Sequence, residues 1–383
     1  MIYFDNNATT RVDPQVFEAM LPFLKEEYGN PSSVYRLGRT AAHAVSHART
    51  QVSDLLGCEP SEIIFTSCGT ESDNSAIAAA LTADPDRKHL VTSKVEHSAI
   101  MKHADVLARR GYEVTFLDVD EDGLLDPQNV ERAIRPDTAL VSLMWANNET
   151  GVLFPIEEIA EICRAKRTLF HTDAVQAIGK VPINLSQLPV QFLSLSGHKL
   201  HAPKGIGALY VNRRVRFAPF LVGGGQEFKR RGGTENTASI VALGAAAALT
   251  VDHAKEATNR VRRLRDRLEA GLQKVSGVAV NGHRKHRLPN TLSLAIEGID
   301  AETMLLVLDQ RGISCSAGSA CTSGALEPSH VLNAMGFSAE RARGSLRFSL
   351  GRFNTEAEVS QALEIIPREV EKVRQLSRGV LAA

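Results

Sequence analysis

Two short segments of the sequence carry groups that could bind a phosphate and form a covalent bond to a carbonyl carbon. In Ser67-Cys-Gly-Thr-Glu-Ser-Asp73, Gly69 and Thr70 would offer free backbone amides and a hydroxyl at the start of an alanine-rich helix, where a phosphate is stabilised. The same residue types also serve ordinary helix capping, so both interpretations stay open. In Ser196-Gly-His-Lys199, a lysine stands beside a glycine turn, and burial there would lower its pKa and free its amine for a Schiff base.

Three further segments add the remaining groups that one particular cofactor requires. His97 ends Val95-Glu-His97, Asp173 stands in Thr172-Asp-Ala-Val-Gln176, and Trp145-Ala-Asn-Asn-Glu-Thr-Gly151 is rich in amides. With the first two segments they supply a phosphate cup, a ring that can stack, an acid and a Schiff-base lysine. Pyridoxal 5'-phosphate (PLP) needs these groups to hold its phosphate, its ring, its pyridinium nitrogen and its aldehyde carbon.

All five segments follow short apolar runs rich in β-branched residues, which predict buried strands. One more run of this kind has none of the five segments after it. The centres of the six runs lie about 25 residues apart, which is the repeat length of a strand followed by a helix. They fall near Thr66, Thr92, Phe116, Leu143, Phe170 and Leu195. This spacing predicts a mostly parallel sheet covered on both faces. Ligands bind beyond the carboxyl ends of such strands, so the five segments are expected to meet there.

A seventh run, Gly207–Val211, follows Leu195 too closely for a helical crossover. We therefore expect an antiparallel strand, either at an edge of the sheet or reached through a tight loop. The predicted fold class is α/β, with a mostly parallel seven-stranded sheet in a large domain of residues 14–251. Asp13 and Pro14 have the residue types that cap and begin the first helix of this domain.

The pattern changes after residue 251. Apolar residues three or four positions apart form one stripe of a long helix between Val251 and Val275, and strand-like segments follow at residues 290–296 and 344–350. The last helix opens with Thr355-Glu-Ala-Glu358, which has the form of a capping box. Residues 1–13 and 252–383 are therefore expected to form a smaller α+β domain, which carries a segment at about 312–328 discussed below.

The composition excludes several classes of protein. The 383 residues include 44 Lys and Arg and 44 Asp and Glu, and this zero net charge argues against a nucleic-acid binder. No apolar run reaches the roughly 18 residues of a membrane span, and the N-terminus does not have the form of a signal peptide. The sequence has five cysteines, Cys58, Cys68, Cys163, Cys315 and Cys321. Their odd number, and the absence of any pair two residues apart, favour neither a disulfide scaffold nor a zinc site. We expect a cytoplasmic protein with no metal of its own.

The sequence resembles the cysteine desulfurases, which share the fold of the class V aminotransferases, the PLP-transferase type I fold. The resemblance covers nearly the whole chain, from Asp5-Asn-Asn-Ala-Thr-Thr10 and Gly29-Asn-Pro-Ser-Ser33 to Arg347-Phe-Ser-Leu-Gly-Arg-Phe353. Its most specific segment is Cys315-Ser-Ala-Gly-Ser-Ala-Cys-Thr-Ser-Gly324, followed by Leu326-Glu-Pro-Ser-His330. Within the family, residues 145–151 and 198–204 are more similar to the nitrogen-fixation (NifS) type than to the housekeeping type.

The resemblance implies a role for each candidate site residue. Lys199 would hold PLP covalently, Asp173 would pair with its pyridinium nitrogen, and Cys321 would take up sulfur. His97 would stack on the ring and take part in proton transfer, and Gln176 would hydrogen-bond the ring hydroxyl. The phosphate would be held by Gly69, Thr70, Ser196 and His198, and Thr234 would reach the phosphate of a neighbouring subunit. Asn148 would contact the cofactor or the substrate, and Arg347 would bind the substrate carboxylate. Strand alternation independently separates Arg347 from Leu346 and Phe348, although it also fits an arginine that faces solvent.

The implied reaction converts L-cysteine to L-alanine. The Cys321 thiolate would attack the substrate sulfur and carry it as a persulfide to an acceptor or scaffold protein for iron–sulfur or metallocluster assembly, and Cys321 could transiently share such a cluster. Small residues surround Cys321, which favours a segment that can carry sulfur over a buried thiol. The resemblance also implies a homodimer with composite active sites.

Two other functions stay open. Another PLP enzyme of this fold, such as a selenocysteine lyase or an aminotransferase, could use Lys199 and Asp173 without Cys321. A non-enzymatic sulfur carrier or metal scaffold could use cysteines and histidines, although no tight metal-ligand spacing supports it: Cys315, Cys321, His198, His201, His283 and His286. A yellow colour bleached by borohydride would exclude the carrier, and equal amounts of alanine and sulfide from cysteine would identify the desulfurase.

Overall fold

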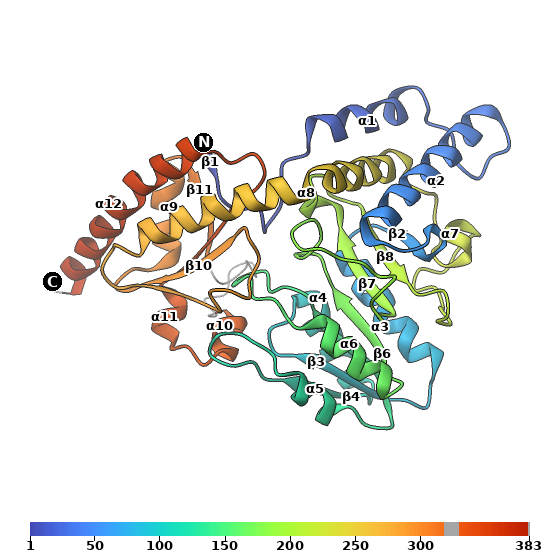
Figure 1. Ribbon diagram of the computed structural model, residues 1–383, viewed down its shortest axis with the longest axis horizontal. Helices are drawn as coiled ribbons and strands as arrows, with labels where there is room; N and C mark the ends of the chain where they lie inside the picture. Colours follow the sequence, from blue (N-terminus) through green and yellow to red (C-terminus); the bar gives the residue numbers. More distant parts are fainter. Residues whose placement is uncertain (318–328, 382–383) are drawn as a thin grey trace.

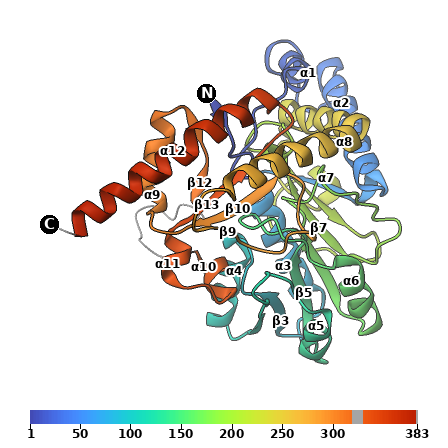
Figure 2. The same ribbon diagram turned by 60° about the vertical axis from the view of Figure 1, so that its left-hand side comes forward.

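The computed structural model describes residues 1–317 and 329–381 (Figures 1 and 2). Cys321 lies outside the described residues. The chain forms a large sheet with helices on both faces and a smaller sheet beside it. The part that contains the smaller sheet also carries both termini (Figure 1).

The predicted seven-stranded sheet is present. Its strands in chain order are β2 (Ile63–Thr66), β3 (His89–Ser93), β4 (Glu113–Leu117), β5 (Thr138–Met144), β6 (Leu169–Asp173), β7 (Phe192–Ser196) and β8 (Gly207–Val211). Their order in space is β2-β8-β7-β6-β5-β3-β4, and β4, β3, β5, β6 and β7 pair in parallel. The carboxyl ends of these five strands therefore meet at one edge of the sheet.

Strand β8 is antiparallel, as predicted, but it does not lie at an edge. It pairs with β7 on one side and with β2 on the other, in antiparallel register with both. The tight-loop alternative is the correct one, because residues 197–206 turn the chain straight back beside β7. All five residues of β8 are buried, as suits an interior strand covered on both faces.

Helices cover both faces of this sheet because neighbouring strand residues point to opposite sides. Ile64 of β2 and Leu140 of β5 pack against α3 and α4, whereas Phe65 and Val141 join a core with α2 and α6. The helices of this part are α1 (Pro14–Lys25), α2 (Arg36–Leu56), α3 (Gly69–Ala83), α4 (Ser98–Arg109), α5 (Pro127–Ala133), α6 (Ile156–Ala165) and α7 (Gln226–Lys229), with 3-10 turns η1 (Pro60–Glu62) and η2 (Gly197–Lys199).

The smaller part contains an antiparallel sheet of order β12-β13-β10-β9 and a parallel pair, β1 with β11. Leu346 and Phe348 of β13 belong to a second hydrophobic core, with residues of α9 and α12. Figure 2 shows these two helices beside the smaller sheet. The strands are β1 (Ile2–Tyr3), β9 (Val278–Val280), β10 (Thr291–Ile296), β11 (Ile313–Ser314), β12 (Ser316–Ala317) and β13 (Ser345–Ser349), and the helices are α9 (Ala301–Gln310), α10 (His330–Ala334), α11 (Ala339–Arg343) and α12 (Glu356–Leu381).

One long helix, α8 (Thr237–Leu272), connects the two parts. Leu243 packs in the first core, and Leu264 and Leu268 pack in the second. No single helix in the described part of the chain is long and apolar enough to cross a membrane. The two sections of α8 pass that test of length and composition only as a pair, and they are bent by 79° relative to each other.

Two predicted helix starts are confirmed. The side chain of Asp13 accepts a hydrogen bond from Gln15 N at the start of α1 (2.7 Å). At the start of α12, Thr355 N donates to Glu358 Oε2 and Glu358 N donates to Thr355 Oγ1, which makes a reciprocal capping box.

Candidate active site

The five polar segments meet at the carboxyl edge of the large sheet. Met144 of β5 pairs with Asp173 of β6, so these two strands end level, and Asp173 pairs with Ser194 of β7, which ends two residues further on at Ser196. The nearest polar side-chain atoms of Asp73, His97 and Asp173 lie within 4.8 Å of one another, although they come from three separate elements. The parallel register therefore brings together residues that are far apart in the sequence.

One end of the site is suited to an anion. Helix α3 begins at Gly69, and its N-cap residue Cys68 does not cap it with a side-chain hydrogen bond, so backbone amides remain available there. A Cβ atom at residue 69 would lie 2.8 Å from Val175 Cγ2, which explains why the turn needs glycine. The Ser196 Oγ atom is buried and has no hydrogen-bond partner within the described residues. Together with Thr70, the second residue of α3, these groups could hold a phosphate.

Lys199 ends the 3-10 turn that follows β7. Its Nζ atom donates to the backbone oxygens of Asn7 and Ala8, the latter at 2.7 Å, in the N-terminal segment. Burial, with the Arg347 guanidinium nearby, lowers the pKa of Lys199 to about 8. A lysine with this pKa supplies a neutral amine far more readily than an exposed one, as nucleophilic chemistry requires.

Asp173 is buried at the end of β6. Its Oδ1 atom accepts a hydrogen bond from Val175 N at 2.9 Å. Burial raises the pKa of Asp173, and the charges of His97 and Lys199 oppose that rise. A carboxylate in this setting needs a nearby cation to stay ionised, and the protonated nitrogen of a pyridine ring is such a cation.

His97 faces the same space from the start of α4. Its Nδ1 atom accepts a hydrogen bond from Ala99 N at 3.2 Å, which places the proton of the neutral ring on Nε2. Burial, with Lys199 and His330 nearby, lowers the pKa of His97 although Asp173 raises it. A neutral imidazole can lie flat against an aromatic ring and can also accept or return a proton.

Gln176 and Asn148 have different surroundings. The Gln176 amide is buried, donates to Asn7 O at 2.9 Å and accepts from Lys180 Nζ at 3.0 Å. The Asn148 side chain makes no hydrogen bond that the structure describes, whereas its backbone oxygen accepts from Asn7 and Arg347. The neighbouring Asn147 is structural, because its Oδ1 atom caps the turn at Glu149 and Thr150.

Arg347 is not an arginine that faces solvent. Only 3% of its surface is exposed, and its guanidinium donates to Asp5 Oδ1 at 2.8 Å and to the backbone oxygen of Asn148 at 2.9 Å. It is close enough to Lys199 for their charges to interact. Strand β13 thus presents a cation to the site from the smaller sheet.

His198 and Thr234 have other surroundings. His198 Nδ1 is 3.2 Å from Thr9 Oγ1, and burial, with Lys199 and Lys204 nearby, lowers its pKa to about 4. Thr234 lines a cavity of about 180 Å³ with Thr66 and Ser67, beside the start of α3.

The structure adds residues to which the sequence patterns assigned no role. Asn7, in the segment Asp5-Asn-Asn-Ala-Thr-Thr10, accepts from Gln176 and Lys199 through its backbone oxygen. Lys180 stands four positions after Gln176, a helical spacing that would have indicated the contact. Buried Asp73 and Glu96 lie next to the site, and each keeps one carboxylate oxygen without a hydrogen-bond partner in the described structure. His171 Nε2 lies 3.6 Å from that oxygen of Asp73.

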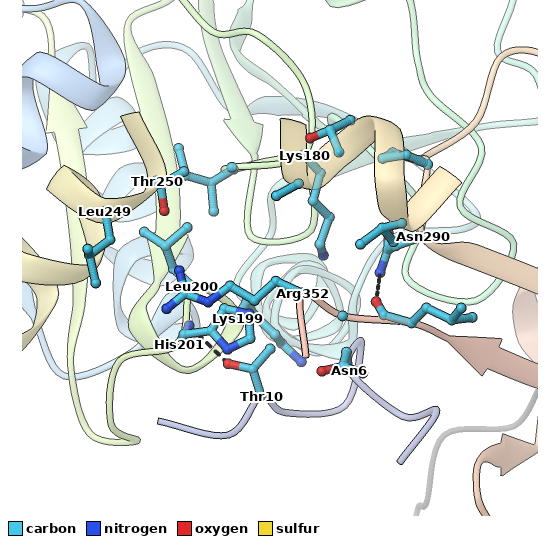
Figure 3. Close-up of a pocket in the computed structure, with 18 residues that line it drawn as sticks. Asn6, Thr10, Lys180, Lys199, Leu200, His201, Leu249, Thr250, Asn290 and Arg352 are labelled. Atoms are coloured by element: carbon cyan, nitrogen blue, oxygen red, sulfur yellow. Dashed lines mark hydrogen bonds between the residues drawn. The ribbon is translucent and has the colours of Figure 1, made fainter. Parts of the chain in front are cut away.

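These residues fit PLP. The unpartnered Ser196 hydroxyl and the uncapped start of α3 suit its phosphate, Asp173 suits its ring nitrogen, and Lys199 suits its aldehyde carbon. Lys199 also borders a cavity of about 90 Å³, shown in Figure 3, which lies between the N-terminal segment, α8 and the residues after β13. A fold and a site of this kind define a PLP-dependent enzyme.

Comparison with known proteins agrees with this class. Residues 2–362 match the aminotransferase class-V family, so the chain belongs to that family, whose members use PLP. The chain is 54% identical to cysteine desulfurase 2 of Trichormus variabilis over 98% of this chain and 95% of the relative, and 51% identical to the cysteine desulfurase NifS of Azotobacter vinelandii over 98% and 94%. A solved NifS-like protein superposes with a TM-score of 0.91 at 39% identity, covering 97% of this chain and 99% of the other.

Proposed function

We propose that the protein is a cysteine desulfurase, which converts L-cysteine to L-alanine and keeps the sulfur as a persulfide on Cys321. The observation that carries the proposal is the meeting of Lys199, Asp173 and His97 at the strand ends, beside the cation of Arg347. The full-length relatives named cysteine desulfurase support the choice of substrate.

The chain's own residues divide the work as follows. Arg347 binds the substrate carboxylate, and this contact orients the α carbon toward Lys199. The neutral Lys199 amine takes the α proton, a task that its lowered pKa permits. Bound PLP supplies the electron sink for that step, and Asp173 keeps the ring nitrogen protonated. His97 returns a proton, since its neutral ring can act in both directions.

Sulfur transfer is assigned to Cys321, which lies outside the described residues. Its thiolate attacks the substrate sulfur, the carbon–sulfur bond breaks, and the carbon product takes up protons to become alanine. The other cysteines whose pKa is shifted are poor candidates. Burial raises the pKa of Cys58 and Cys163 to about 12, and it raises the pKa of Cys315 as well, so these thiols are protonated at neutral pH.

The test is incubation of the PLP-loaded protein with L-cysteine and a thiol reductant. We expect alanine and sulfide in equal amounts, a yellow protein that borohydride bleaches, and no turnover by Lys199→Ala. A keto acid in place of alanine would identify an aminotransferase, and turnover of selenocysteine alone would identify a selenocysteine lyase. A colourless protein without turnover would contradict the whole assignment.

We further propose a homodimer in which Thr234 contacts the phosphate site of the partner. Apolar side chains that a monomer would leave in water support this, among them Val222, which is 86% exposed, with Phe228, Tyr28, Val34 and Tyr35. Mixing inactive Lys199→Ala and Thr234→Ala proteins should restore part of the activity in heterodimers. A fully active monomer on size exclusion would contradict the composite site.

The proposed partner beyond L-cysteine is a sulfur-acceptor or iron–sulfur scaffold protein, with nitrogen fixation as the role that the NifS relative suggests. Persulfide chemistry needs a free thiol, so the proposal includes a reducing compartment, the cytoplasm. A pull-down with persulfide-loaded protein should transfer labelled sulfur to such an acceptor.

A further inference from the structure

The side-chain amide of Gln176 is held in one orientation from both ends. Its Oε1 atom accepts a hydrogen bond from Lys180 Nζ at 3.0 Å, and its Nε2 atom donates to the backbone oxygen of Asn7 at 2.9 Å. The Asn7 carbonyl can only accept, and a protonated Lys180 amine can only donate. Turning the amide over would lose the bond to Asn7 and, whenever Lys180 is protonated, the bond to Lys180 as well, so Lys180 and Asn7 together determine which end of Gln176 faces the site.

The second N–H of Gln176 has no acceptor among the described residues. The Asn7 oxygen that receives Nε2 also receives the amine of Lys199, so the NH2 end of the amide lies on the Lys199 side. Gln176 thus offers the site a donor and not an acceptor. A donor stabilises an anionic oxygen in preference to its protonated form.

Lys180 itself has no evident duty in folding. No carboxylate of the described residues forms an ion pair with it, and its side chain points into the cavity that Lys199 and Arg352 also line (Figure 3). Burial, with the charges of Lys199 and Arg347, lowers the pKa of Lys180 to about 7. The charge of Lys180 in turn helps to lower the pKa of His198 and His201. Burying a lysine among other cations, with one amide as its hydrogen-bond partner, lowers the stability of the protein. A role in the site is a reason for keeping such a residue.

We propose that Lys180 is a positioning residue, which orients Gln176 so that its amide N–H is presented to the ring oxygen of bound PLP. This inference rests on the proposed function only in assuming that PLP is the bound group. Lys180 acts on the bound group through its hydrogen bond to Gln176.

The test compares Lys180→Met, Lys180→Arg and Lys204→Met. Methionine keeps an unbranched apolar chain but removes the donor, arginine keeps a donor, and Lys204 is an exposed lysine near the site without a contact to Gln176. The readouts are the dissociation constant of PLP and the pH midpoint of its visible absorption band in the absence of substrate.

Lys180→Met should weaken PLP binding about ten-fold and raise the midpoint by about one pH unit, because the anionic oxygen loses a donor. Lys180→Arg should restore most of both values, and Lys204→Met should change neither. An unchanged midpoint in Lys180→Met, or an equal shift in Lys204→Met, would overturn the proposal. A wild-type protein that does not bind PLP would instead contradict the proposed function.

Discussion

The guanidinium of Arg347 donates to Asp5 Oδ1 at 2.8 Å, which joins strand β13 to the N-terminal segment at the site. Ser316 Oγ donates to the same carboxylate oxygen at 2.8 Å. The proposed carboxylate receptor is therefore fixed in place before substrate arrives, and a carboxylate already occupies one of its donors.

Replacing Arg347 by lysine should raise the KM for L-cysteine with a smaller effect on kcat. Lysine keeps the charge but cannot reproduce the fork of donors, and a lost charge-assisted hydrogen bond of about 1.4–2.8 kcal/mol corresponds to about ten- to hundred-fold in KM. Steady-state kinetics over a wide cysteine range measures this. An unchanged KM would remove Arg347 from substrate binding.

Replacing Asp5 by asparagine should have the opposite effect. Asparagine can still accept from Arg347 and Ser316 through its Oδ1 atom, but it no longer competes with the substrate for positive charge. We expect the KM for L-cysteine to fall about five-fold, which corresponds to about 1 kcal/mol. A rise in KM would show that the charge of Asp5 is needed to hold Arg347.

Capture of PLP by the apo-protein should depend on pH through Lys199. The protonated amine cannot attack an aldehyde, and the pKa of Lys199 is about 8, so the rate of covalent capture should increase as the pH rises from 6 to 9. Stopped-flow absorption with the apo-protein measures this rate, and Lys199→Ala is the control that binds without capture. A rate that falls with pH would contradict the assignment of Lys199.

Glu96 should make the protein less stable as the pH rises. Its side chain is fully buried, Oε1 accepts from Ser93 Oγ at 2.6 Å and from Met144 N, and burial raises its pKa to about 8. The folded protein therefore holds a proton that the unfolded chain releases above pH 4.5, so this stabilisation is complete below pH 4.5 and is lost as the pH approaches 8.

Glu96→Gln removes this titration and keeps the acceptor oxygen. Its free energy of unfolding relative to the wild type should increase by up to about 1.4 kcal/mol per pH unit between pH 4.5 and 8. Denaturant unfolding of the apo-protein at several pH values measures the difference, with the exposed Glu157→Gln as the matched control. Parallel pH profiles for Glu96→Gln and the wild type would contradict a proton on Glu96.

The sequence predicted the parallel strands and the polar segments after them, because both follow from local patterns of apolar and polar residues. The interior place of β8 could not be predicted in this way, since its partner β2 is far away in the chain. The role of Asn7 could not be predicted for the same reason, because it meets Lys199 across a separation of 192 residues. The domain boundary at residue 251 stays a prediction. Val331 and Leu332, which follow that boundary in the chain, pack in the core of the large sheet, and sequence periodicity does not reveal this contact.

Persulfide formation on Cys321 is the central claim. Cys321→Ser should keep the yellow colour, because Lys199, Asp173 and the groups proposed to hold the phosphate are unchanged, and should lose alanine formation. A serine hydroxyl is not ionised at neutral pH and cannot replace the thiolate.

The most direct measurement is peptide mass spectrometry of the wild-type protein after brief exposure to L-cysteine, with and without a thiol reductant. The account predicts one added sulfur, about 32 Da, on the peptide that contains Cys321, and its removal by the reductant. Added sulfur on Cys315 instead, or full alanine production by Cys321→Ser, would contradict it.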